Sequence, residues 1–229
     1  MQFALLFVLG SSLGLGMRRI IFWRRMGFPR TARRLYRLFA WSLGLGTWLS
    51  MLVQETVLLL SGLLTWQTGL PLHLCSLMGL ISLPMLLSGN RLLWHASLYL
   101  GLPGALAALL FPAILETDYP QLTVVSFHAM HVCLLLAPFL PLSLGRMPSP
   151  RGAGSAWGLL LLLGCVALTV NALLESNYLF LSWAPPGTPL ALLTGGGRTA
   201  YVLTLTALSA LLLALEAAAM HFLLRHQRT

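Results

Sequence analysis

Apolar residues fill most of the chain in long stretches, and polar residues gather in the shorter segments between them. A helix needs about 20 largely apolar residues to cross a bilayer. Seven stretches predict such helices, at about residues 1–17, 38–64, 70–87, 92–115, 121–144, 156–176 and 199–224. The pattern therefore predicts an all-α, polytopic membrane protein in which residues 1–229 form a single bundle of seven transmembrane helices.

The first stretch is the shortest, and its flanking charges decide how it is interpreted. Its arginines, Arg18 and Arg19, follow the apolar run instead of preceding it. A cleaved signal peptide has the opposite order. We therefore expect this stretch to be a true helix of the bundle.

The overall composition agrees with a chain that mostly avoids water. Hydrophobic residues make up 58% and charged residues only 8%, whereas soluble domains carry about a quarter charged residues. The formal net charge of +9 would suggest a nucleic-acid partner in a soluble protein. In a membrane protein the position of each charge matters more, so we expect membrane lipids as partners and no nucleic acid.

The arginines predict the orientation of the bundle. Eight of the 14 lie between residues 18 and 37, and alternation of seven helices places five more on the same side, namely Arg91, Arg146, Arg151, Arg225 and Arg228. Only Arg198 then lies on the other side. Short cytoplasmic segments are enriched in Arg and Lys. The N-terminus is therefore predicted outside and the C-terminus inside, in a multi-pass protein of the cell membrane.

Two segments between predicted helices have more than one interpretation. The basic segment, residues 18–37, mixes arginines with Ile, Phe, Trp and Tyr, so it is either a plain topology signal or a surface that recruits anionic lipid. The apolar segment Asn177–Arg198 is broken by Pro and Gly. It is expected to lie on the membrane or dip into it, against protein or water.

Polar residues inside the predicted helices are the main functional signal, because ionisable groups in a membrane are costly and usually functional. Counting along each helix places one set in the outer half of the bilayer: Gln54, Glu55, His73, Cys75, His128, His131, Asn171 and Glu175, followed by Asn177 and Tyr178. His95 and Glu216 fall in the inner half. The outer set predicts a cavity open to the outer leaflet.

Spacing restricts the roles within this cavity. His128 and His131 are three residues apart and share a helix face. Pro71 suggests that a helix begins there, which places Cys75 close to a helix N-terminus. The partial positive charge there favours thiolate, burial in an apolar setting opposes it, and a nearby histidine can shift the balance by accepting the proton. Other readings stay open: Cys75 as a packing residue, histidines that only bridge helices, or a zinc site with ligands from Glu55, His73, His128 and His131.

Four motifs occur in order between Pro71 and Leu181: PLHLCSL, YLGLPGALAALLFP, FHAMH and NYLFL. Together they resemble the YwaF-like bacterial integral membrane proteins. The chain departs from that pattern at Phe111, where the family has threonine, and at GGGRTAY, which replaces a Gly-Pro-Trp-Pro-like stretch. The second departure leaves a role for the last loop in doubt.

The same architecture is similar to eukaryotic transmembrane protein 164, an acyltransferase that remodels ether phospholipids through a cysteine and a histidine. The resemblance implies that Cys75 is the nucleophile and His131 its base. It predicts a lipid acyltransferase or acyl hydrolase that acts on phospholipid or lysophospholipid without a cofactor or metal. The residues expected to bind substrate are Glu55, His73, His128, Asn177 and Tyr178, with Asn177 as a candidate oxyanion donor. Two alternatives remain, a metal-dependent intramembrane lipid hydrolase and a non-enzymatic transporter or sensor.

Overall fold

The computed structural model describes residues 2–226, and every regular element within that range is helical. In chain order these elements are α1 (Gln2–Arg25), α2 (Pro29–Leu60), α3 (Leu74–Ser88), α4 (Arg91–Ala96), η1 (Ser97–Gly101), α5 (Leu102–Leu110), α6 (Pro120–Leu136), η2 (Ala137–Leu144), α7 (Pro150–Leu174), η3 (Tyr178–Phe180), η4 (Pro189–Gly196) and α8 (Gly197–His226). The segments α4, η1 and α5 follow one another without a gap, as do α6 and η2.

The helices have the length and composition that a membrane protein requires. Six helical segments in the described range are long and apolar enough to cross a membrane: Ala4–Arg25, Pro29–Leu60, Arg91–Leu110, Pro120–Leu144, Pro150–Leu174 and Pro189–Met220. The helix α3 is apolar but has only 15 residues. These findings confirm the all-α class and a multi-pass membrane protein, while the side of the membrane at which each end lies stays a prediction.

The arginine-rich segment differs from the expected loop. Helix α1 continues to Arg25 and α2 begins at Pro29, so only residues 26–28 form the turn. Gly27 has a φ of 81°, a conformation that glycine adopts without strain. Pro29 stands in the first turn of α2, where its missing N–H costs nothing. The eight arginines therefore lie on or beside a helical hairpin instead of a flexible connection.

Other helix ends also differ from the predicted bounds, for local reasons. Helix α3 begins at Leu74, four residues later than expected, and α5 ends at Leu110, two residues before Pro112. A residue that precedes proline is pushed towards extended backbone, which explains the early end of α5. Helix α7 begins at Pro150, six residues earlier than expected, because proline suits a first turn.

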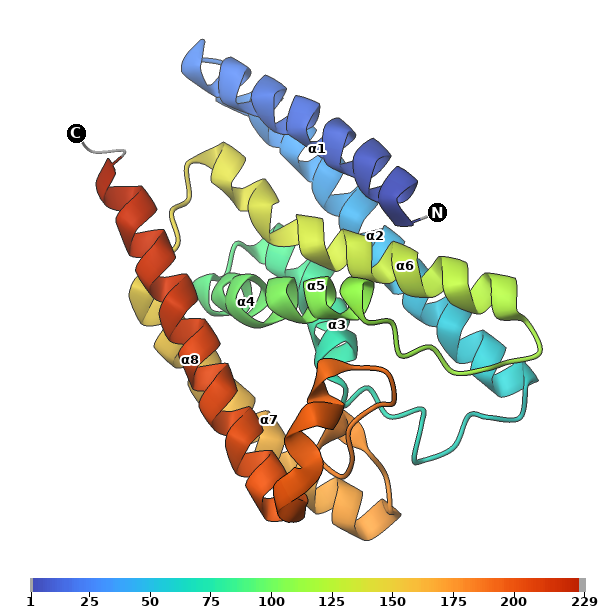
Figure 1. The fold of residues 1–229 in the computed structure, drawn as a ribbon. Coiled ribbons are helices and arrows are strands. Elements are labelled where there is room, and N and C mark those ends of the chain that lie inside the picture. Colours follow the sequence, from blue (N-terminus) through green and yellow to red (C-terminus); the bar gives the residue numbers. More distant parts are fainter. Residues whose placement is uncertain (1, 227–229) are drawn as a thin grey trace.

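Helix α2 packs against several other helices. It packs against α1, α3 and α6, while α7 packs against α4 and against α8 (Figure 1). Gly44 of α2 permits the close approach of α3, because a Cβ there would lie 2.6 Å from the side chain of Leu83. One buried cluster gathers around Tyr36 and Trp94, and a second around Met78 and Leu134.

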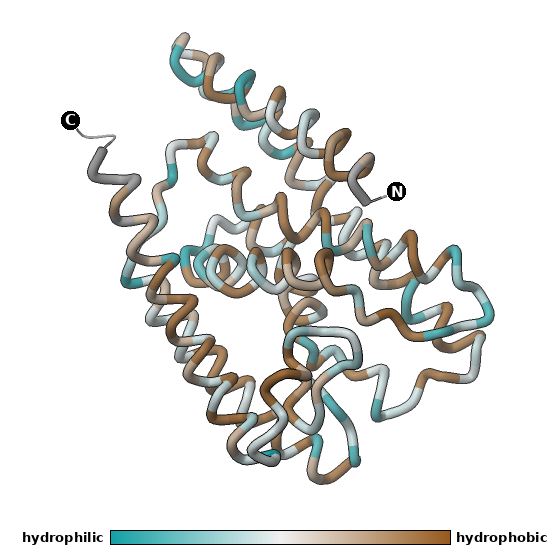
Figure 2. The backbone as a smooth tube through the Cα atoms, viewed as in Figure 1, coloured by the Kyte–Doolittle hydropathy of each residue, from teal (hydrophilic) through white to brown (hydrophobic). Residues whose placement is uncertain are grey.

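The connections between helices gather at two opposite ends. At the first end, the guanidinium of Arg24 covers Gly145, and Arg146 Nη1 donates to the Gly89 carbonyl at 2.8 Å. Figure 2 shows hydrophilic residues concentrated at the tip of the α1–α2 hairpin, on the same side as the C-terminal end of α8. At the second end, the Asp118 N–H donates to Ser61 Oγ at 3.2 Å.

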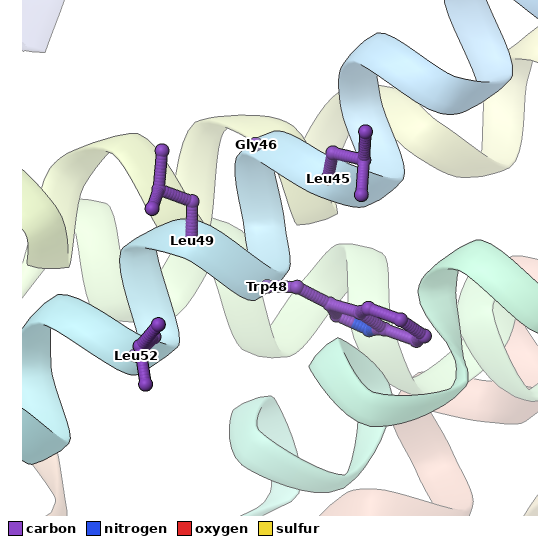
Figure 3. A pocket seen from close by; sticks show the side chains of 5 residues that line it. All are labelled: Leu45, Gly46, Trp48, Leu49 and Leu52. Atoms are coloured by element: carbon purple, nitrogen blue, oxygen red, sulfur yellow. The ribbon is translucent and has the colours of Figure 1, made fainter.

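A shallow hollow of about 440 Å³ lies on the outer face of α2 and is lined by Leu45, Gly46, Trp48, Leu49 and Leu52 (Figure 3). The indole of Trp48 points towards α3 and its Nε1 donates to the Gly79 carbonyl at 3.1 Å. The remaining lining is apolar. This hollow is therefore a surface suited to the acyl chains of surrounding lipid.

Candidate functional site

The first turn of α3 presents Cys75. His73 is the residue before the helix, with extended backbone, and its carbonyl accepts the Leu77 N–H at 3.0 Å. Cys75 is thus the second helical residue, close to the partial positive charge of a helix N-terminus. Its thiol is half-buried and has no hydrogen-bond partner within residues 2–226. Gly104 of α5 faces it, since a Cβ on Gly104 would lie 3.8 Å from Sγ.

Two histidines lie one helical turn apart on α6. Nδ1 of His131 lies 2.7 Å from the Phe127 carbonyl, and Nδ1 of His128 lies 2.7 Å from the Val124 carbonyl. A carbonyl only accepts, so each Nδ1 must carry the hydrogen, and a neutral ring then has its lone pair on Nε2. His131 is 3% exposed, and its ring centroid lies 4.2 Å from that of Phe127.

Cys75 and α6 border the same buried cluster. Cys75 packs against the cluster that contains Met130, the residue before His131. In the described part of the chain no hydrogen bond joins Cys75 to His131, and the hollow in Figure 3 includes neither side chain. Their joint cavity in the outer half of the membrane therefore stays a prediction.

Tyr178 lies beside another predicted site residue, His73, at the second end of the bundle. It is fully buried, and its hydroxyl donates to the Trp66 carbonyl at 2.8 Å and accepts the Leu70 N–H at 3.0 Å. Its ring centroid lies 5.2 Å from that of His73. Burial raises the pKa of Tyr178 and the nearby Glu55 carboxylate raises it further, while the Leu70 contact lowers it. The structure thus brings the rings of His73 and Tyr178 together.

Asn171, which the sequence placed in the outer polar set without a binding role, fixes the position of Tyr178. Its Oδ1 accepts the Tyr178 N–H at 2.7 Å and the Ser176 hydroxyl at 2.9 Å, and its Nδ2 donates to the Tyr178 carbonyl at 3.0 Å. Asn171 is 3% exposed. The sequence signal for this role was an amide side chain in an apolar helix, about two turns before the NYLFL motif. A buried amide is almost always hydrogen-bonded.

The loop after α7 contains unusual backbone. Glu175, Leu179 and Phe180 have φ values of 54°, 56° and 55°, and non-glycine residues seldom adopt this left-handed region. The ring of Phe180 lies 5.2 Å from that of His73 by centroids. Such strain persists only where surrounding contacts enforce it, and the hydrogen bonds of Asn171 are among those contacts.

Asn177 stabilises the same loop. Its Oδ1 accepts the N–H groups of Ser182 and Trp183, at 3.0 Å and 3.1 Å, and its Nδ2 donates to the Trp183 carbonyl at 2.9 Å. These bonds occupy the acceptor and one of the two amide hydrogens. The structure therefore gives Asn177 a role in loop shape, and its part in oxyanion binding stays a prediction.

Among the described residues, no group of three His, Cys, Asp or Glu side chains is placed to hold a metal ion. His95 instead connects α4 to α7, because its Nε2 accepts the Ser149 N–H at 3.3 Å and its ring lies against Gly152. Glu216 Oε2 is buried and has no hydrogen-bond partner among the described residues.

Comparisons with known proteins give one match. A model of the TMEM164 family matches residues 2–216, which extend from the first residue of α1 to the second half of α8. No curated protein and no solved structure matches the chain. The predicted likeness to transmembrane protein 164 is thus confirmed at the level of the family, whereas the likeness to YwaF-like bacterial proteins stays a prediction.

Proposed function

This chain belongs to the TMEM164 family, and on that premise we propose that it is an intramembrane acyltransferase or acyl hydrolase that acts on phospholipids through Cys75 and His131. The observation that carries the proposal is the hydrogen bond from His131 Nδ1 to the Phe127 carbonyl. It holds the imidazole in the tautomer whose Nε2 is free to take a proton. A fixed imidazole with an unprotonated ring nitrogen can act as a general base.

Cys75 has the features of a nucleophile in this arrangement. It lies in the first turn of α3, where the helix dipole favours thiolate. Gly104 adds no side chain of its own beside Sγ, where a Cβ would lie 3.8 Å away. Because the thiol makes no hydrogen bond in the described structure, it can approach an ester carbonyl without first breaking one.

The first half-reaction forms a thioester. His131 Nε2 takes the proton of Cys75, directly or through an intervening hydroxyl, and Sγ attacks the ester carbonyl of a phospholipid. The C–S bond forms, the C–O bond of the ester breaks, and the protonated imidazole returns its proton to the leaving lysolipid oxygen. The acyl chain then remains on Cys75.

The second half-reaction releases the acyl chain. A hydroxyl of a lysophospholipid or of water attacks the thioester carbonyl while His131 takes its proton. The new C–O bond forms, the C–S bond breaks, and the proton passes to the departing thiolate. A lysolipid acceptor makes the protein an acyltransferase, and water makes it a hydrolase. We place both lipids in a cavity in the outer half of the cell membrane, beside Glu55, His73, His128, Asn177 and Tyr178.

An acyl-transfer assay tests the proposal. Purified protein is incubated in vesicles with a phospholipid that carries a labelled acyl chain and with an unlabelled lysophospholipid. We expect Cys75→Ala to abolish both transfer and release of the label. Cys165→Ala is the matched control, because Cys165 is an exposed cysteine on the outer surface of α7, and it should retain full activity.

The assay also separates the alternatives. Full activity in Cys75→Ala would overturn the thiol mechanism, and loss of that activity with a chelator would replace it with metal-dependent hydrolysis. The absence of transfer and hydrolysis in the parent protein across phospholipid classes would favour a non-enzymatic transporter or sensor.

A further inference from the structure

A groove runs between α1 and α2 near the tip of their hairpin. It has a volume of about 390 Å³, and its lining is mostly apolar, with Leu15, Gly16, Leu35, Leu38 and Phe39. Gly16 is needed here because the Phe39 ring occupies the position that a Cβ would take. The groove is therefore shaped by the packing of the two helices and is not a product of flexible side chains.

A guanidinium stands at the tip end of this groove. Arg19 belongs to the lining, one helical turn after Leu15 and Gly16 on the same stripe of α1. Arg34 precedes Leu38 by four residues on α2 and so lies on the groove's stripe of that helix. Since Gly16 meets Phe39 across the antiparallel pair, Arg19 and Arg34 lie at a similar level.

The charge around the groove is not balanced. Eight exposed arginines, Arg18, Arg19, Arg24, Arg25, Arg30, Arg33, Arg34 and Arg37, lie on the hairpin. The first acidic residue of the chain is Glu55, which lies about 27 Å from Arg37 along α2 at 1.5 Å per residue. No acidic residue occurs in the sequence before Glu55. We therefore expect the arginines near the tip of the hairpin to attract anions from outside the chain.

We propose that this groove binds an anionic phospholipid, with the phosphate at Arg19 and Arg34 and an acyl chain along Leu15, Leu35 and Leu38. Guanidinium groups form strong, often bidentate hydrogen bonds with phosphate. The apolar lining is continuous with the guanidinium end, which matches the arrangement of a headgroup and its chain. This site is separate from Cys75 and His131 and does not depend on the acyl-transfer proposal.

The surroundings favour a lipid over a soluble polyanion. Phe22, Met26 and Phe28 at the hairpin tip are 54%, 58% and 53% exposed, and large apolar side chains beside arginines suit the headgroup layer. Both helices are long and apolar enough to span the membrane, so their tip emerges where headgroups lie. A nucleic acid offers phosphate but no chain for the groove.

Native mass spectrometry of the full chain in detergent tests the site, with dioleoyl phosphatidylglycerol as the probe and dioleoyl phosphatidylcholine for comparison. We expect Arg19→Gln with Arg34→Gln to weaken phosphatidylglycerol binding by about tenfold or more, since each charge-assisted hydrogen bond contributes an energy of that order. The matched control is Arg151→Gln with Arg198→Gln, which removes two exposed arginines outside the hairpin. It should leave the affinity unchanged.

Two further variants separate charge from shape. Arg19→Lys with Arg34→Lys keeps the charge, so it should retain most of the affinity and show that the loss in the glutamine variant follows from the missing charge. Ser12→Trp fills the groove, which Ser12 also lines, without altering charge, and should weaken binding of the full lipid. Equal losses in the hairpin and control glutamine variants, or unchanged affinity in Ser12→Trp, would overturn the proposal. Displacement of the lipid by equimolar inorganic phosphate would identify a free-anion site instead, and displacement by an oligonucleotide a nucleic-acid surface.

Discussion

His131 Nδ1 lies 2.7 Å from the carbonyl oxygen of Phe127, one helical turn earlier on α6. The bond fixes the ring in the buried part of the bundle and leaves Nε2 as the basic nitrogen. In an apolar setting a fixed proton acceptor is an uncommon feature, because ionisable groups in a membrane are costly. The central claim of the proposed function is that His131 Nε2 accepts the proton of the Cys75 thiol.

Replacement of His131 by asparagine tests the base while keeping the bond to Phe127. The asparagine amide can still donate to that carbonyl, but it cannot accept a proton at neutral pH. We expect His131→Asn to fold normally and to slow acyl transfer by about 10²–10⁴-fold, measured as initial rates in vesicles. A rate within a factor of two of the parent protein would remove His131 from the mechanism.

Asn171 is predicted to be a structural residue whose loss is costly. Asn171→Ala leaves the Tyr178 N–H, the Tyr178 carbonyl and the Ser176 hydroxyl without their partner. Each stranded buried group costs about 1–3 kcal/mol, so thermal unfolding in detergent should occur at a clearly lower temperature. Thr169→Ala, on the exposed face of the same helix, is the control and should unfold like the parent protein.

The Tyr178 hydroxyl is predicted to anchor the connection between α2 and α3. In Tyr178→Phe the Trp66 carbonyl and the Leu70 N–H lose their partner. Hydrogen exchange should therefore become faster in residues 61–73, which lead into His73 and Cys75. Tyr119→Phe changes a tyrosine that is 42% exposed and should have no such effect. Unchanged exchange in Tyr178→Phe would show that the ring alone holds this segment.

Gly44 is predicted to set the distance between α2 and α3. An alanine Cβ there would lie 2.6 Å and 2.7 Å from Leu83 side-chain atoms and 3.0 Å from its Cα, so the helices would have to separate. Overpacking of this kind costs about 1–3 kcal/mol. Gly158→Ala is the matched control, since nothing lies within 4 Å of a Cβ at that position. Equal unfolding temperatures for the two variants would contradict the close approach.

The sequence predicted the helices well because their signal is local. Apolar runs long enough to span a bilayer are visible without knowledge of neighbours. The start of α3 was predicted less well, since Pro71 indicated a first turn there and the helix begins later, at Leu74. The arginine-rich hairpin was predicted to be a loop because a dense run of charged residues indicated a break between two transmembrane helices. Arginine is in fact a good helix former, and helix α1 continues through Arg18 and Arg19 to Arg25.

The candidate site was less accessible to sequence reasoning because its contacts are long-range. The rings of His73 and Tyr178 are in contact although the residues lie more than a hundred positions apart in the sequence. The spacing of apolar and polar residues along the chain does not predict such a contact. The hydrogen bonds of Asn171 to Tyr178 could not be predicted, since they depend on left-handed backbone at Glu175, which lies between the end of α7 and Tyr178. The motifs marked the segments that meet, but only coordinates show how their hydrogen bonds are shared.

The most direct test of the account is the intact mass of the protein during turnover. The protein is incubated with a phospholipid of known acyl composition, without an acceptor lysolipid, and the reaction is stopped in acid. We predict a mass increase equal to one acyl group minus one hydrogen, located on Cys75 by peptide mapping, removed by hydroxylamine and absent in Cys75→Ala. Active transfer without any adduct on Cys75, or the same adduct in Cys75→Ala, would contradict the thioester mechanism.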